Sequence, residues 1–180
     1  MSTITTILHL PSGFLSPKLV FSLLKMVLEE FKWIKPYRYG AISPDLKLLV
    51  DGSYIEKLTQ FYKQNQRLAL DDRARSSWIQ LFPDRQGQET YTGNLTWSVP
   101  AQLTKKSTWR QAHAEQLLKL MKLLKSPLVV SSLEEDIEHK AFRLVTDPED
   151  SDIREELPNV SSYNQGLNSL FWRNFYGPEF

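Results

Sequence analysis

The last eleven residues, Leu170 to Phe180, constrain the fold of this chain more than any other segment, because five of them are aromatic. A chain terminus is usually polar and frays in solvent. A terminus of this composition has to pack on the protein's own core or on a partner. We therefore expect the carboxyl end to be folded and to act as a structural anchor. The expected anchor residues are Trp172, Asn174, Phe175, Tyr176, Gly177 and Pro178.

The small and polar residues of this anchor have expected roles. Asn174 can satisfy backbone groups at a turn, Gly177 can take a positive φ, and Pro178 fixes its own backbone. The aromatic side chains would clamp an edge strand of a sheet. Direct contact between these aromatic residues and a partner is the alternative.

The composition indicates one domain and excludes several classes of protein. A chain of 180 residues with 41% hydrophobic and 12% aromatic residues suits a single globular domain over residues 1–180. The net charge of +1 does not favour binding to nucleic acid or to anionic lipid. Cysteine is absent, which excludes disulfides, thiolate metal sites and cysteine nucleophiles.

Targeting and membrane signals are also missing from the pattern. No Lys or Arg precedes the apolar run that ends at Leu10, so this run does not resemble a secretory signal. Lys, Glu or Pro interrupts the longest apolar segments well before the roughly 20 residues that span a bilayer. We expect a cytoplasmic protein with no membrane partner.

Hydrophobic periodicity predicts both strands and helices. Residues 91–99 alternate apolar and polar side chains and form an expected hairpin with residues 78–82. Ser16 and Ser53 are plausible N-caps of the first two helices. Strands are predicted at 4–10, 33–42, 78–82, 91–99 and 142–145, an apolar segment at 128–130, and helices at 17–31, 54–62 and 108–125. The acidic segment from Asp147 to Glu156 is predicted to be a loop.

This order of elements indicates an α+β domain in which helices pack on one face of a mostly antiparallel sheet. Two successive strand-helix-strand units also suggest an internal duplication, which we hold as a hypothesis.

The histidines do not lie in a pattern that predicts catalysis. His113 precedes Glu115 by two positions, so on a helix their side chains point in different directions. His139 follows a run of carboxylates that lacks the spacing of a calcium loop. We predict no catalytic residue, no metal site and no cofactor. The alternative is a small enzyme that uses Asp or Glu side chains with His113 or His139.

Acidic residues are concentrated near the end of the chain, with ten carboxylates between residues 134 and 156. Such a concentration of negative charge can steer a basic partner and speed its association. The alternative is a solvated surface with no partner. The predicted partner-binding residues are Glu134, Glu135, Asp136, Glu138, Asp147, Glu149, Asp150 and Asp152.

The segment from Gly166 to Phe180, with its Phe-Trp-Arg-Asn-Phe-Tyr-Gly-Pro core, resembles the aromatic segment of bacterial immunity proteins of the immunity protein 52 type. The Tyr39-Gly40 turn, the strand around Trp97 and the segment from Leu124 to Leu133 support it loosely. Members of that family continue beyond the Gly-Pro pair, whereas Glu179 and Phe180 end this sequence.

The resemblance implies an α+β protein without enzymatic activity that neutralises a polymorphic or contact-delivered toxin. Such a protein binds its cognate toxin domain, often a nuclease, and blocks the active site or substrate path. No individual binding residue is carried over, because the toxin-facing surface varies between members. An accessory binding protein of a phage or mobile element is a further alternative.

Overall fold

The computed structural model describes residues 2–11, 13, 15–48, 54–83, 93–147, 150–156 and 172–177, with the backbone alone over residues 138–156. The strands are β1 (Thr3–His9), β2 (Arg38–Gly40), β3 (Leu46–Lys47), β4 (Leu68–Asp71), β5 (Trp78–Phe82), β6 (Asn94–Pro100), β7 (Leu128–Leu133), β8 (Phe142–Asp147), β9 (Asp150–Glu156) and β10 (Arg173–Tyr176). The helices are α1 (Pro17–Leu24), which continues as a π-helical segment (Lys25–Glu30), α2 (Tyr54–Asn65), a 3-10 helix (Ala101–Lys105), α3 (Ser107–Leu124) and α4 (Glu134–Ala141).

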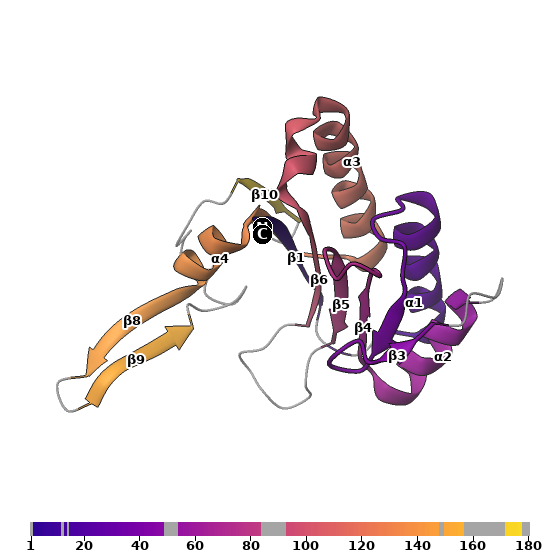
Figure 1. Ribbon diagram of the computed structural model, residues 1–180, viewed down its shortest axis with the longest axis horizontal. Helices are drawn as coiled ribbons and strands as arrows, with labels where there is room; N and C mark the ends of the chain where they lie inside the picture. Colours follow the sequence, from indigo (N-terminus) through magenta and orange to yellow (C-terminus); the bar gives the residue numbers. More distant parts are fainter. Residues whose placement is uncertain are drawn as a thin grey trace.

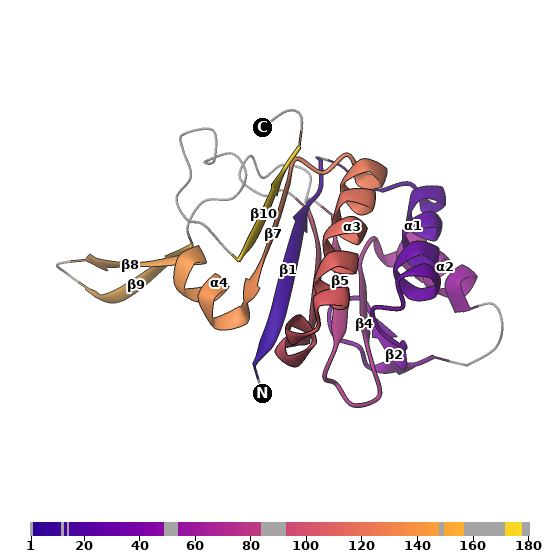
Figure 2. The same cartoon turned by 90° about the horizontal axis from the view of Figure 1, so that it is seen from above.

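The main sheet has eight described strands in the order β10-β7-β1-β6-β5-β4-β2-β3. Every neighbouring pair in it is antiparallel. Helices α1, α2 and α3 lie together on one face of this sheet (Figures 1 and 2). The structure thus confirms the predicted α+β class with a mostly antiparallel sheet. Helix α4 lies on the other side of the sheet, beside the ends of β1 and β7 (Figure 1).

The hydrophobic core fills the space between the sheet and these three helices. Strand β6 buries Leu95, Trp97 and Val99, which are alternate residues, as the pattern predicts. Helix α3 buries the face that the sequence indicates: Leu117, Leu120, Met121 and Leu124. At the start of α1 the Ser16 hydroxyl accepts a hydrogen bond from the Leu19 amide at 3.3 Å, and Pro17 is the first helical residue. The second expected cap, Ser53, lies outside the described residues.

Two parts of the sheet differ from the sequence-based expectation. Strand β4 was not predicted, because its four residues are all buried and do not alternate. Aspartate is uncommon in a buried strand, but the Asp71 carboxylate forms an ion pair with the Arg38 guanidinium at 2.8 Å. The strand expected over 33–42 is limited to Arg38–Gly40, and Pro36, which has no amide hydrogen to donate, lies in the part that is not a strand.

The loop predicted from Asp147 to Glu156 is wrong over residues 150–156, which form strand β9 and pair with β8. The pairing places Arg143 opposite Glu155, and Val145 opposite Ile153. The acidic composition of residues 150–156 therefore does not prevent their pairing as a strand. Figures 1 and 2 show this hairpin projecting from α4, away from the main sheet.

The topology includes two similar crossovers. Strands β6 and β7 are joined through α3 and both pair antiparallel with β1, which lies between them. In the same way, β3 and β4 are joined through α2 and lie on either side of β2. These are two strand-helix-strand units, each split by a third strand. The internal duplication suggested by the sequence stays a hypothesis.

The carboxyl-terminal segment forms strand β10, which pairs antiparallel with β7 at one edge of the main sheet. Phe175 packs against the hydrophobic core, whereas 41% of the surface of Trp172 and 40% of that of Tyr176 are exposed to solvent. Gly177 does not have the positive φ that we expected. A side chain there would place its Cβ 2.8 Å from the Ser126 carbonyl oxygen, so glycine permits a close backbone approach instead.

We predict that removing residues 172–180 destabilises the protein by about 3 kcal/mol or more, because Phe175 loses its packing and β7 becomes an open edge. That loss is a large part of a typical domain stability of about 5–15 kcal/mol. Thermal melting and solubility measure it. Removal of residues 178–180 alone keeps β10 and is the matched control. A protein without 172–180 that melts like the full chain contradicts the anchor hypothesis.

Candidate functional site

The predicted partner-binding residues belong to α4 and to the β8–β9 hairpin, which we call the acidic arm (residues 134–156). Glu134 and Glu135 are exposed in the first turn of α4, where carboxylates interact favourably with the helix dipole. Glu138 lies in the same helix, and Asp147, Asp150 and Asp152 lie in the two hairpin strands. Glu149 lies outside the described residues.

The start of the acidic arm is fixed to the main sheet by hydroxyl groups. Thr3 donates a hydrogen bond to Glu134, and Ser132 donates one to Asp136. The same Ser132 hydroxyl accepts a hydrogen bond from the Trp172 amide at 3.4 Å. Ser132 therefore joins the two residue sets that the sequence singled out, the acidic arm and the carboxyl-terminal anchor. The sequence gives only a weak signal for it, a serine within a buried apolar strand.

Charge is distributed unevenly between the acidic arm and the rest of the chain. The arm has ten Asp and Glu residues against three Lys and Arg residues, whereas the remainder has 11 acidic against 19 basic residues out of totals of 21 and 22. The near-neutral total charge therefore hides a negative arm attached to a positive body. The field around such a molecule is strongly directional.

His113, a buried residue of α3, belongs to an aromatic cluster between this helix and the sheet. Its ring stacks on Trp109 with centroids 4.6 Å apart, and Trp97 and Trp172 lie at 5.8 Å and 6.3 Å. Arg173 covers the Trp172 ring at 4.5 Å and donates to the Arg110 carbonyl oxygen at 2.7 Å. The cluster therefore connects β10, α3 and β6.

The polar atoms of His113 are poorly satisfied. Its Nε2 lies 3.4 Å from the Thr6 hydroxyl, which in turn lies 2.7 Å from the Ser131 hydroxyl. Its Nδ1 is buried without a hydrogen-bond partner. Burial, followed by the nearby charge of Arg173, lowers the pKa of His113 to about 3. A base this weak is poorly matched to proton abstraction at neutral pH, which favours a packing role.

His9 and His139 belong to other elements. His9 is at the end of β1, and burial lowers its pKa to about 4. His139 lies in the second half of α4, residues 138–141, where only the backbone is described. The described side chains include no group of three or more His, Asp or Glu residues that could hold a metal ion. Among the described helices, none is long and apolar enough to cross a bilayer.

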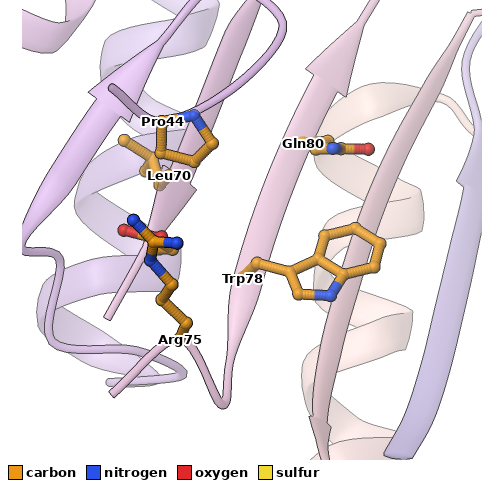
Figure 3. Close-up of a pocket in the computed structure, with 6 residues that line it drawn as sticks. Pro44, Leu70, Arg75, Trp78 and Gln80 are labelled. Carbon is orange, nitrogen blue, oxygen red and sulfur yellow. The ribbon is translucent and has the colours of Figure 1, made fainter. Parts of the chain in front are cut away.

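A second candidate site was not found from the sequence. It is an open hollow of about 210 Å³ beside strands β4 and β5, lined by Pro44, Leu70, Asp71, Arg75, Trp78 and Gln80. Figure 3 shows Arg75 and Pro44 on one side of this hollow, and Trp78 and Gln80 on the other. The sequence signal was faint because Arg75 and Trp78 lie in different elements, a turn and a strand.

No protein-family model matches this chain, and a search of curated proteins finds no significant match. An interpretation of its function therefore depends on the chemistry of these surfaces and on the resemblance of the carboxyl-terminal segment.

We predict that His113 makes the protein less stable as the pH falls. The unfolded chain binds the proton with a pKa near 6.5, well above the folded value of about 3. Stability is therefore complete above pH 6.5 and is lost progressively towards pH 3. Between about pH 6.5 and 5, one such histidine lowers the free energy of unfolding by about 1.5 kcal/mol.

Denaturant unfolding of the His113→Gln variant across this pH range measures the effect. The free energy of unfolding of this variant should fall less between pH 6.5 and 5 than that of the wild type, whatever its stability at neutral pH. The His9→Gln variant is the matched control, because it measures how much His9 contributes to the same pH dependence. A pH profile that His113→Gln leaves unchanged contradicts the prediction.

Proposed function

We propose that this protein is a non-enzymatic immunity protein that binds a cognate bacterial toxin in the cytoplasm and blocks its active site or substrate path. The observation that carries the proposal is the acidic arm, which projects from the sheet and concentrates negative charge on a protein that is otherwise basic (Figure 1). The partner it fits is a basic protein domain. A nuclease toxin is such a domain, because it has to bind phosphates.

The physical argument rests on electrostatic steering. A charged element that extends from a protein raises the rate of encounter with an oppositely charged partner, and salt screens the effect within about 10 Å at 0.1 M ionic strength. The first turn of the arm is held in place through Thr3 and Ser132, so Glu134 and Asp136 are positioned before a partner arrives. Preorganisation of this kind reduces the cost of binding.

The resemblance of Gly166–Phe180 to immunity proteins supports the same proposal. The low pKa of His113 also favours the proposal over an enzyme that uses this histidine, which lies beside a hydroxyl group and aromatic rings. The adjacent reading frame identifies the candidate partner, and a nuclease-like domain encoded there would be the protein to test.

We predict that neutralising the arm slows association with the toxin about tenfold or more at low salt, because steering depends on the charge of the arm. The variant is Glu134→Gln, Glu135→Gln, Asp150→Asn and Asp152→Asn combined. Association rates of purified proteins and survival of cells that express the toxin measure the effect. The wild-type rate should fall with added salt, and the rate of the variant should change less.

The matched control is Glu29→Gln with Glu30→Gln, an adjacent pair of exposed glutamates at the end of the π-helical segment on the opposite side of the sheet. This control should bind and protect like the wild type. Equal binding by the arm variant would contradict the role of the arm. Failure of the wild-type protein to bind or protect against the neighbouring product would contradict the proposed function.

A further inference from the structure

The hollow between Arg75 and Trp78 is built on an ordered turn. The Asp72 carboxylate accepts hydrogen bonds from the amide and hydroxyl of Ser76 at 2.9 Å and 2.8 Å. The Arg75 amide donates to the Asp72 carbonyl oxygen at 3.2 Å, and Arg75 has a φ of 56°, which is uncommon outside glycine. These contacts fix the backbone from which the exposed Arg75 side chain extends.

Asp71 in the lining of the hollow and Asp72 beside it already have partners. Asp71 accepts a hydrogen bond from Arg38 Nε at 2.9 Å and forms an ion pair with Arg38 Nη2 at 2.8 Å. Asp72 is bound to Ser76 within the turn. The positive charge of Arg75, and of Arg73 above the Tyr37 ring, is therefore left to face outwards. A guanidinium in this position favours a carboxylate, which it can bind through two parallel hydrogen bonds.

The size of the hollow indicates the kind of group that it accepts. Its volume of about 210 Å³ is below the range of about 300–1,000 Å³ that is usual for small-molecule sites. Trp78 and Gln80 supply an apolar wall and an amide on the side opposite Arg75 (Figure 3). Tryptophan and arginine are also the residues most enriched at the centres of protein interfaces. The hollow therefore fits an acidic side chain on a protein segment.

We propose that this hollow binds the acidic arm of a second copy of the same chain, so that the protein associates head to tail. The arm has ten acidic residues against three basic ones, and the remainder of the chain that carries the hollow has 19 basic residues against 11 acidic ones. The negative arm is thus complementary in charge to Arg75 and Arg73, the exposed cations beside the hollow. This association does not depend on the proposed function, because it requires no toxin.

A molecule cannot readily place its own arm in its own hollow. The arm starts from α4 beside β7 and β1, whereas the hollow lies at β4 and β5. From β7 to β4 the sheet order passes through β1, β6 and β5, which at about 4.8 Å per strand is roughly 19 Å. The hairpin also points away from β4 in both views (Figures 1 and 2). The contact is therefore between molecules.

Head-to-tail contacts use two different surfaces, so they produce closed rings or open chains rather than a symmetric dimer. We expect assemblies at low salt whose mass increases with protein concentration, and monomers at high salt, since charge pairs at a surface are screened. Light scattering after size-exclusion chromatography and analytical ultracentrifugation measure the mass.

The decisive experiment mixes two variants. The first is Arg75→Glu, which reverses the charge of the arginine in the hollow. The second is Asp150→Lys with Asp152→Lys, which reverses the charge of two residues of the arm. Each variant alone should associate about tenfold more weakly or worse, because it has lost a charged contact. Mixed together they should associate again, since the two lysines introduced on the arm of one variant now meet the glutamate in the hollow of the other.

Lys122→Glu is the matched control, because Lys122 is exposed on α3 and far from both surfaces. It should assemble like the wild type. Thermal melting checks that each variant is folded. Monomers at every concentration in low salt, undiminished assembly of Arg75→Glu, or no recovery on mixing would each overturn the proposal. Arg75-dependent binding of a single-stranded oligonucleotide without self-association would assign the hollow to phosphate and overturn it as well.

Discussion

The packing of Trp97 is the interaction on which most of the structure depends. This side chain lies on β6, near the middle of the main sheet, and is 1% exposed. It stacks on Trp33 at 3.8 Å, and His113 lies against it from α3. Trp33 in turn donates a hydrogen bond from its indole to Gln116 of α3 at 2.7 Å. One aromatic residue of the sheet thus fixes both α3 and the segment after α1, and buried aromatic pairs of this kind contribute beyond their apolar area.

The sequence was sufficient for those elements whose pattern has a single explanation. Strand β6 alternates and α3 has one apolar face, so both were predicted to within a few residues. The sequence was insufficient where the secondary structure of a residue depends on a partner that is distant in sequence. Asp71 lies in strand β4, where the distant Arg38 pairs with it, and the acidic segment 150–156 is paired with β8. Local propensity contains no information about either partner.

Of the two candidate sites, one was predicted from the sequence and the other was not. A run of carboxylates is visible in any sequence, so the acidic arm was found, although its form as a helix and a projecting hairpin was not. The hollow was missed because Arg75, Trp78 and Gln80 become a surface only when the turn after β4 brings them beside Pro44. Gly177 shows the limit of reasoning from residue type alone. Glycine was expected there for its φ, whereas the structure uses it for the close approach of Ser126.

The position of β1 has a consequence for the synthesis of this protein. The strand is formed by residues 3–9, yet its two neighbours in the sheet are β6 and β7, which extend to Leu133. A growing chain therefore carries β1 with both edges unpaired until β6 has left the ribosome, and with one edge unpaired until β7 follows. Contacts this distant in sequence slow folding and lengthen the time during which strand edges are open to other chains. The amino-terminal strand is thus the part of the newly made protein that most needs protection from aggregation.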